Sequence, residues 1–529
     1  MKKQILSNLG SNYLSKIIIM ALGFFIVPFL TRKLSPELYG VTVLAESSIL
    51  FFQIVTNSMK TAMGRFATFS LSEGKKEEFV AYLSSGRFLL FGCAAAALVF
   101  GGLISYFYPY AIHLDPVHLG ETKLLFFLVT LGFTLSIPNI IFSSVLIAKQ
   151  RPDLVNVAMA GAAILRAALL VVVYTFFAGQ SLLAYGWIYL VTSCLQNIFV
   201  YALYKKLMPG IRIHRKHFSK DRAREIFSFS LHTSAGHLSE ILYDNTALVI
   251  IGSFWGPALV AIYSISLKFA QILKRLFIEG SWSLMPTFVD LVAKNDSEKR
   301  HRLFMMYTKI MCMISTPLCI LLILTARPLI VFWTGEEFVM SAGLLPFHIV
   351  PLFVAIPFSV CFCLFCAYGK VKIPSLMSLA SAIVNVFLGL LFGVGFSWGL
   401  YGIAAAASLT LVIYLGVFFP YYACKIAGES LSKYLIQGFL KPFGLAWAVF
   451  GAGYLVFRTQ NMEWSLNAAT LLASGALSLV YAALAFFFVL DSFERNNIFK
   501  IFASFRPRRQ KAVRAAPADI CLKPEFINK

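Results

Sequence analysis

The stretch "GPALVAIYSISLKFAQILKRLFIEG", residues 256–280, has the length and apolar character of a helix that crosses a membrane. Lys268 stands near its middle. An ammonium group at bilayer depth costs about 3 kcal/mol on insertion scales, so such residues face a protein interior or a water-filled cavity rather than lipid. The stretch therefore predicts a membrane protein whose helices surround a polar interior.

The composition agrees with this prediction. Of the 529 residues, 59% are hydrophobic and 13% are charged, and the mean hydropathy is +0.77. At this composition a water-soluble domain would lack the polar surface to cover itself. Apolar runs of about 18 to 25 residues predict about fourteen transmembrane helices, and therefore an all-α polytopic membrane protein.

The charge follows the expected topology of such a protein. Lys and Arg number 46 against 24 Asp and Glu, which gives a formal net charge of +22. If Lys2 and Lys3 lie in the cytoplasm, about 37 of the 46 basic residues fall on that side, as the positive-inside rule requires. We predict a multi-pass protein of the bacterial inner membrane with both termini cytoplasmic. Anionic membrane lipids, and not nucleic acid, are the expected partners of the basic charge.

The two halves of the chain share a pattern. In "LTRKLSPELYGVTVLAESSILFFQIV" (30–55) and "IIGSFWGPALVAIYSISLKFAQILKR" (250–275), a span ends, a short Gly/Pro turn follows, and the next span begins with small and polar residues. This predicts two six-helix lobes in a parallel pseudo-twofold repeat. The predicted organisation is a first lobe at 1–205, a basic cytoplasmic linker at 206–226, a second lobe at 227–424, two extra helices at 425–490 and a basic cytoplasmic tail at 491–529.

Polar residues form stripes on four of the predicted spans, the first two of each lobe. Side chains three, four or seven residues apart share one face of a helix. The stripes are Asn12, Lys16 and Gly23; Glu46, Gln53, Asn57 and Lys60; Ser230, Thr233, His237, Glu240 and Asp244; and Ser264, Lys268, Gln271, Arg275 and Glu279. Since each stripe must avoid lipid, we predict that the four spans enclose a polar cavity on the pseudo-twofold axis.

Cations in such a cavity indicate an anionic ligand. Lys16 and Lys268 lie too deep to reach the headgroups, whereas Lys60, Arg275 and Lys309 lie nearer the inward ends and snorkelling would explain them equally. Arg166 has no polar stripe, so a buried ion pair and a ligand contact both remain open. The predicted substrate-binding residues are Lys16, Lys268, Arg166, Gln53, Asn57, Gln271 and Arg275.

Acidic residues and a histidine in the same stripes are candidates for ion coupling. They are Glu46, His237, Glu240 and Asp244. A carboxylate cluster would bind Na+ or exchange H+, and a histidine beside carboxylates titrates near neutral pH. Structural roles are the alternatives: Glu46 as the partner of a lysine, and His237 as an ordinary packed residue. No other cofactor, no metal site and no catalytic residue is predicted.

The predicted outward loops are all short, which bears on the class of protein. The longest, near residues 106–123 and 327–343, have fewer than about twenty residues, too few for an acceptor-binding domain. The sequence also contains no phosphate-binding loop, dinucleotide fingerprint or nucleophile elbow. A membrane-embedded polymerase or glycosyltransferase is therefore disfavoured, and we expect a transporter rather than an enzyme.

Three stretches resemble a known group of transporters. They are "NYLSKIIIMALGFFIVPFLTRKLSPELYGVTVL" (12–44), "GRFATFSLSEGKKEEF" (64–79) and "YDNTALVIIGSFWGPALVAIYSISLKF" (243–269). With the predicted topology, they are similar to the multidrug/oligosaccharidyl-lipid/polysaccharide (MOP) exporter superfamily, and most similar to its Wzx-type polysaccharide flippases. Here lysine stands at cavity positions where relatives carry other cations.

The resemblance implies a fold and a function. Two six-helix lobes would form a V, with helices one, two, seven and eight around a central cavity and two extra C-terminal helices. The implied substrate is an undecaprenyl-pyrophosphate-linked oligosaccharide repeat unit, moved to the outer leaflet for lipopolysaccharide or exopolysaccharide synthesis. A polysaccharide polymerase and glycosyltransferases are the implied protein partners. A cation-coupled multidrug exporter of the same superfamily is the alternative.

Overall fold

The computed structural model describes residues 2–112, 114–177, 181–209, 215–459, 468–492, 494 and 495, and at a few of these, Asp244 among them, only the backbone. All regular secondary structure in this part of the chain is helical, which confirms the predicted all-α fold. The predicted basic tail at 491–529 lies almost wholly outside the described residues.

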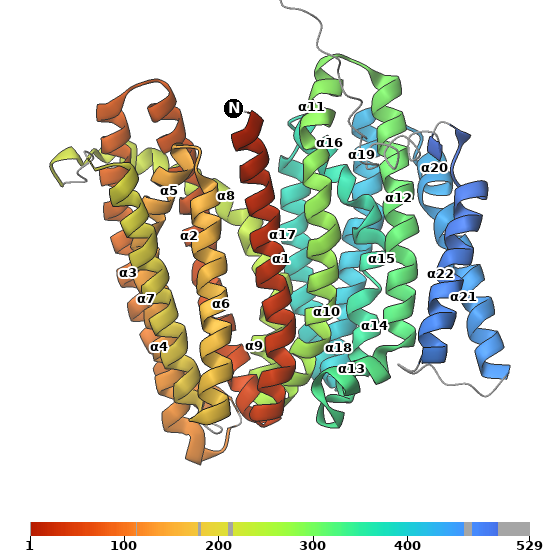
Figure 1. The fold of residues 1–529 in the computed structure, drawn as a ribbon, viewed down its shortest axis with the longest axis horizontal. Coiled ribbons are helices and arrows are strands. Elements are labelled where there is room, and N and C mark those ends of the chain that lie inside the picture. The colour runs from red at the N-terminus through yellow and green to blue at the C-terminus, as the bar shows by residue number, and fades with distance from the viewer. Residues whose placement is uncertain are drawn as a thin grey trace, which may run out of the picture.

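The first half of the chain forms one group of long, roughly parallel helices, drawn at the left of Figure 1. They pack on one another through the pairs α4–α7, α3–α4, α1–α6 and α6–α7. Their bounds are α1 (Lys2–Lys33), α2 (Pro36–Ser72), α3 (Lys76–Ala111), α4 (Leu119–Ser136), α5 (Ile140–Ala148), α6 (Pro152–Phe176) and α7 (Leu182–Leu207).

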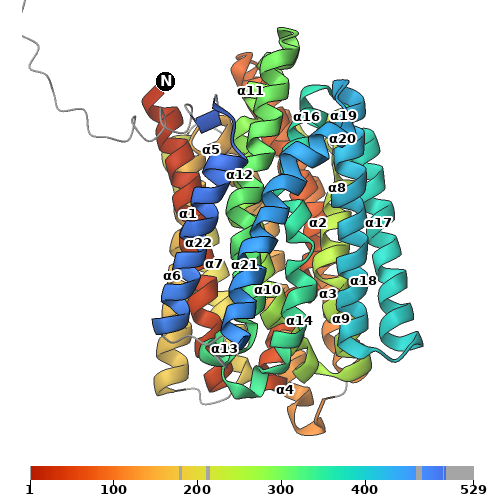
Figure 2. The ribbon, with the colours of Figure 1, turned by 90° about the vertical axis from the view of Figure 1, so that its right-hand side faces the viewer.

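The second half contains more breaks, and all but its first two helices form the group at the right of Figure 1. Its helices are α8 (Lys220–Asp244), α9 (Thr246–Trp255), α10 (Pro257–Ser281), α11 (Met285–Ala293), α12 (Ser297–Leu324), α13 (Ala326–Thr334), α14 (Met340–Ile349), α15 (Leu352–Ala355), α16 (Val360–Ala367), α17 (Lys372–Leu390), α18 (Gly399–Leu411), α19 (Phe419–Ala427) and α20 (Leu431–Tyr434). Two final helices, α21 (Lys441–Thr459) and α22 (Ala468–Phe488), lie against α12 on one side of the molecule (Figure 2).

Ten helical segments of the described chain are long and apolar enough to cross a membrane, or eleven if the bent pair Met340–Ala355 and Pro357–Ala367 is one span. α8 and α10, which carry two of the polar stripes, are not among them, and the apolar part of α22 is short, at Leu472–Phe488. A multi-span membrane protein is confirmed, while the count of fourteen stays a prediction.

Local sequence sets the start of the two helices that bring the halves together. Ser35 caps α2 by accepting a hydrogen bond from the backbone N–H of Leu38, and Pro36 occupies the first helical position. In α10 the first position is again a proline, Pro257, after Gly256 with φ of +87°. Proline has the backbone angle that a first turn needs and no N–H to leave unpaired there.

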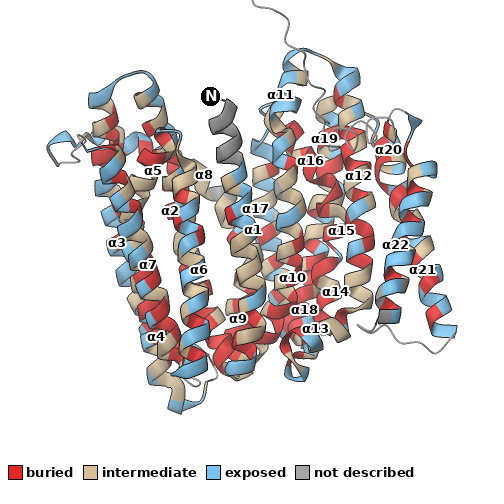
Figure 3. Cartoon of the chain, in the orientation of Figure 1, coloured by how far each residue is buried: buried red, intermediate tan, exposed pale blue. Residues whose placement is uncertain are grey.

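The two halves meet tightly at the end of the bundle opposite the N-terminus. Phe24 of α1 stacks on Trp333 of α13, with ring centroids 4.7 Å apart, and the Arg32 guanidinium donates to the Phe332 carbonyl at 3.2 Å. Buried residues of both halves gather at this end (Figure 3). We refer to it as the sealed end.

α8 begins at the other end of the bundle and contacts both halves. Arg222, near its start, forms an ion pair with Glu78 of α3 at 2.5 Å, and the Tyr82 hydroxyl of α3 donates to Glu225 at 2.5 Å. Near the end of α8, Tyr243 is hydrogen-bonded to Ser381 of α17. The start of α8 therefore packs on α3, while the helix as a whole lies against α2 of the first half and α17 of the second half. The predicted lobe boundaries themselves remain a prediction.

Lys309 of α12 has a partner that the sequence did not indicate. Its ammonium donates to both carboxylate oxygens of Glu494, at 3.0 and 2.9 Å, and the two side chains are 10% and 5% exposed. Glu494 in turn accepts from the backbone N–H of Asp491. Lys309 therefore forms a buried ion pair to the segment after α22 and does not snorkel.

Candidate functional site

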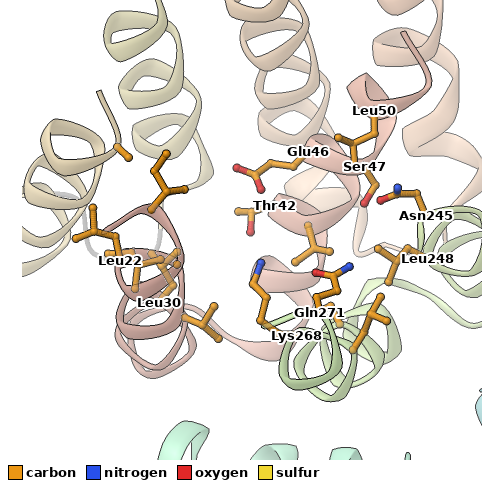
Figure 4. Close-up of a pocket in the computed structure, with 18 of the residues that line it drawn as sticks. Leu22, Leu30, Thr42, Glu46, Ser47, Leu50, Asn245, Leu248, Lys268 and Gln271 are labelled. Atoms are coloured by element: carbon orange, nitrogen blue, oxygen red, sulfur yellow. The ribbon is translucent and has the colours of Figure 1, made fainter. Parts of the chain in front are cut away.

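A cavity of about 520 Å³ lies between the two halves. The residues that line it come from α1, α2, α6, α7, α8, α9 and α10, together with Asn245 at the α8–α9 junction. Figure 4 shows Glu46, Thr42, Lys268 and Gln271 projecting into the same space. The structure therefore brings together the four predicted stripe helices, and adds α6 and α7.

Most of the predicted site residues line this cavity. They are Glu46, Gln53, Asn57, Arg166, His237, Glu240, Lys268, Gln271 and Arg275. Lys16 does not: it is exposed on α1, three residues before Ile19, the first residue of that helix to line the cavity. Asp244 ends α8, and its side chain lies outside the described part of the structure.

The cavity is closed toward the sealed end and open toward the end that carries the N-terminus. Lining residues near the sealed end, such as Leu30, Tyr39 and Asn245, are buried. Lining residues toward the N-terminal end, such as Asn57 and Arg275, are exposed. A polar molecule would therefore enter from the N-terminal end.

Glu46 is held by a tyrosine from another helix. The Tyr185 hydroxyl of α7 donates to Glu46 Oε1 at 2.6 Å, and Tyr185 is 7% exposed. This bond occupies one of the two carboxylate oxygens and fixes the direction of the side chain. Tyr185 and Tyr39, which also lines the cavity, were not predicted, because a single tyrosine in an apolar span has no pattern that separates a lining role from packing.

Lys268 has no hydrogen bond or ion pair to any other residue whose side chain the structure describes. Glu46 and Arg275 are the charged groups near enough to act on it electrostatically. Figure 4 shows Lys268 and Glu46 projecting toward one another, with Thr42 beside them. The ammonium is thus half-buried in the cavity without a direct anionic partner, which leaves its hydrogen-bond donors for a ligand.

Arg166 is bound by neutral groups. Its Nε donates to Thr192 Oγ1 at 3.2 Å and its Nη2 to Ser193 Oγ at 3.5 Å, while the guanidinium carbon lies 4.2 Å from the Tyr189 ring centroid. No carboxylate of the described residues forms an ion pair with it. Of the two alternatives for Arg166, the geometry favours contact with a ligand, because its partners orient the guanidinium without neutralising it.

The span that begins with α8 is broken beside the cavity. α8 ends at Asp244, and after Asn245, with φ of −126°, α9 begins at Thr246. Asn245 is 8% exposed and lines the cavity. Backbone irregularity at membrane depth is tolerated where it lines a cavity. Among the described residues, no three His, Cys, Asp or Glu side chains come together as metal ligands.

Comparison with known proteins places the chain in a group of membrane proteins. Residues 29–342, more than half of the chain, match the protein family described as "Polysaccharide biosynthesis protein". A curated relative from Bacillus subtilis (strain 168), "Uncharacterized membrane protein EpsK", is 22% identical over 504 residues, which are 94% of this chain and 97% of the relative.

Solved structures show the same fold. The lipid II flippase MurJ in an inward closed conformation matches with a TM-score of 0.64 at 18% identity, over 93% of this chain and all of MurJ. A multidrug resistance MATE family transporter of the MOP superfamily, in an inward-facing conformation, matches with a TM-score of 0.63 at 14% identity, over 81% of this chain and 99% of that structure. These similarities confirm the MOP-type fold.

Proposed function

This chain belongs to the family of polysaccharide biosynthesis proteins, and on that basis we propose that it is a flippase for lipid-linked oligosaccharides. The proposed substrate is an undecaprenyl-pyrophosphate-linked repeat unit that the protein moves from the cytoplasmic to the outer leaflet for surface polysaccharide synthesis. We propose glycosyltransferases, which act before this step, and a polysaccharide polymerase, which acts after it, as the protein partners.

One observation carries the proposal: the cavity between the halves holds cations that no described carboxylate pairs directly. Lys268 has no direct partner, and Arg166 is held by hydroxyl groups. A charge at membrane depth is costly unless it serves a ligand or ion pathway. A pyrophosphate-linked sugar offers the anion, and the amides of Gln53, Asn57 and Gln271 match sugar hydroxyl groups.

Transport would require that the cavity is open to one side of the membrane at a time, while its other end is closed. With the N-terminus in the cytoplasm, the open end faces the cytoplasm and the sealed end faces outward. The headgroup enters the cavity while the polyprenyl chain stays in lipid. The two halves then rock, the sealed end separates, and the headgroup leaves toward the outer leaflet.

A coupling ion would bias this cycle. Glu46 of α2 and His237 and Glu240 of α8 line the same cavity. Asp244 is the last residue of α8. We propose H+ or Na+ exchange at these residues as the step that returns the empty protein to its inward-open state. Loss of the pH or Na+ dependence of flipping in Glu240→Gln would support this role, and unchanged dependence would contradict it.

A cation-coupled multidrug exporter is the second candidate. The cavity contains Glu46 together with the aromatic residues Tyr39 and Tyr185, a combination that suits an organic cation. The cations Arg166, Lys268 and Arg275 would repel such a ligand, so the flippase is the better supported of the two.

The test is flipping in reconstituted liposomes. Undecaprenyl-pyrophosphate-linked oligosaccharide is placed in one leaflet, and an external glycan-modifying enzyme reports its arrival in the other. Lys268→Ala should abolish flipping, whereas Lys274→Ala, on the same helix but outside the cavity lining, should not. If wild-type protein leaves the glycolipid in place and exports a lipophilic cation dye, the flippase proposal fails and the exporter replaces it.

A further inference from the structure

A second cavity, of about 590 Å³, lies near the N-terminal end of the bundle and shares no lining residue with the central one. Its lining is Phe66 of α2 and, from the first three turns of α8, Asp221, Arg224, Glu225, Ser228 and Phe229. Arg222 of α8 forms an ion pair with Glu78 in the first turn of α3, so the start of α8 lies level with the turn that joins α2 to α3. We call this cavity the α2–α8 hollow.

The α2–α8 hollow faces away from the central cavity. Phe66 follows Asn57, a residue of the central cavity on α2, by nine positions, and Ser228 precedes His237, a residue of the central cavity on α8, by the same number. Nine residues make two and a half helical turns, so each pair lies on opposite sides of its helix. The hollow is therefore outside the path that the proposed transport substrate would take.

The protein surface beside the hollow is apolar. Phe227 and Leu231 of α8 are 56% and 63% exposed, and Leu231 lies two turns beyond Arg224 on the same side of the helix. On α2, Phe69 is 59% exposed, about one turn from Phe66. Exposed apolar patches of this kind mark contact with lipid. Charged groups at the end of the bundle, followed by apolar groups deeper in it, match the order of headgroup and acyl chains in a phospholipid.

Two charged side chains of the hollow have no partner among the residues whose side chains the structure describes. Asp221 and Arg224 are exposed, stand three residues apart on one face of α8, and form no ion pair or side-chain hydrogen bond. Glu225 differs, because it accepts hydrogen bonds from the Tyr82 hydroxyl and from Arg222. The hollow thus offers one free carboxylate and one free guanidinium side by side.

Aromatic rings form the rest of the lining. The Phe66 ring stacks on Tyr82 of α3 with centroids 4.9 Å apart and meets the Phe229 ring edge-on at 5.8 Å. The Arg65 guanidinium carbon lies 4.8 Å from the Phe229 ring centroid. Rings held in this way from three helices give the hollow a fixed shape, and apolar walls with a few convergent polar groups are typical of a small-molecule site.

We propose that the α2–α8 hollow binds a phospholipid whose headgroup carries an ammonium with N–H groups, as phosphatidylethanolamine does. The ammonium donates to Asp221, the phosphate accepts from Arg224, and the acyl chains run along Phe66 and Leu231. A headgroup without a cation leaves Asp221 unmatched, and the choline headgroup has no N–H to donate. The bound lipid joins α2 to the start of α8. This site is separate from the proposed transport function, and neither proposal depends on the other.

The test is a series of headgroups with constant acyl chains. The full chain in detergent, freed of copurified lipid, is titrated with phosphatidylethanolamine, its N-methyl and N,N-dimethyl derivatives, phosphatidylcholine and phosphatidylglycerol, and binding is measured by native mass spectrometry. Because a charge-assisted hydrogen bond to Asp221 is at stake, phosphatidylethanolamine should bind about tenfold more tightly than phosphatidylcholine. The affinity should fall mainly at the last methylation, which removes the last N–H. Phosphatidylglycerol should also bind more weakly than phosphatidylethanolamine.

Matched variants assign the preference to the hollow. Asp221→Asn should bind phosphatidylethanolamine and phosphatidylcholine about equally, and Arg224→Gln should weaken every phospholipid. Asp221→Glu, which keeps the charge in the first turn of α8, should retain the preference and show that the start of the helix is still folded. Glu77→Gln is the control, since Glu77 is exposed at the same end but does not line the hollow, and its ratio should match that of the wild type.

Three results would overturn the proposal. The first is equal binding of phosphatidylethanolamine and phosphatidylcholine by the wild-type protein. The second is a preference that Asp221→Asn keeps in full, because the hollow would then not be its source. The third is tighter binding of phosphatidylcholine, which would show that the aromatic rings, and not Asp221, receive the cation.

Discussion

Gly40 of α2 lies directly against the backbone of Pro257 in α10, the first residue of that helix. A Cβ atom built on Gly40 would come within 1.8 Å of the Pro257 carbonyl oxygen. Backbone cannot move aside as a flexible side chain can, so only glycine allows this approach. The contact joins the two halves at the sealed end, so the proposed rocking of the halves would break it when that end opens.

Gly40→Ala should shift the protein toward the outward-open arrangement. Forcing a methyl group into a closely packed contact typically costs about 1 to 3 kcal/mol, and under the proposed rocking motion the outward-open arrangement would escape that cost. Pulsed EPR distances between spin labels on α1 and α13 at that end should lengthen, and flipping should slow. Gly92→Ala is the control, since a Cβ there meets nothing within 4 Å. An unchanged distance distribution would contradict this role for Gly40.

Glu46→Gln should strengthen binding of anionic ligands. Glutamine keeps an acceptor for the Tyr185 hydroxyl but removes the negative charge that acts on Lys268. One unit of charge in a partly dry site corresponds to about a tenfold change in affinity or more. Equilibrium binding of a disaccharide linked to farnesyl pyrophosphate, measured with the full chain in lipid nanodiscs, checks this. Weaker binding by the variant would show that the carboxylate itself contacts the ligand.

Lys309→Met should destabilise the folded protein by about 3 to 5 kcal/mol, because the buried Glu494 carboxylate would lose its only cationic partner among the described residues. The double variant Lys309→Met/Glu494→Leu should recover most of that loss, since two apolar side chains need no charge compensation. Thermal unfolding in detergent micelles is the measurement. Lys294→Met, which breaks the exposed pair with Asp290, should change stability by less than about 1 kcal/mol. Equal effects of the two single variants would argue against a buried pair.

Arg222→Glu should loosen α8 from α3. The substitution replaces the ion pair with Glu78 by a repulsion and also repels Glu225. These side chains are partly exposed, so the energetic effect is on the order of 1 kcal/mol. Spin labels on α3 and α8 should report a wider distance distribution at the N-terminal end. Adding Glu78→Arg should narrow it again, and if it does not, the pair is not what holds the two helices together.

Much of the site could be predicted because the stripes follow helical periodicity. Glu46, Gln53 and Asn57 on α2, and Lys268, Gln271 and Arg275 on α10, line the cavity as their spacing predicts. Lys16 lies on the cavity-facing side of α1, since it precedes Gly23 by seven residues. Helical periodicity predicts which side of a helix a residue is on, but not how far along the helix the cavity extends. The lining of α1 begins only at Ile19, so Lys16 lies beyond it.

Other features had no local signal. Arg166 stands alone in its span, and its partners Thr192 and Ser193 come from α7, so only tertiary packing shows that it borders the cavity. The partner of Lys309 is 185 residues away in the chain. The break after Asp244 contains no proline or glycine, the residues by which helix ends are usually found.

The position of α8 has a consequence for protein engineering. The long basic segment before Lys220 is the natural place to cut the chain when halves of related transporters are exchanged. A cut there would pair Arg222 and Glu225 of α8 with a foreign α3 in place of Glu78 and Tyr82, because the start of α8 packs on α3. A junction at Asn245, where the helix already breaks, would keep α8 together with α2 and α3 and would place its contacts with α9 and α17 between the two exchanged halves.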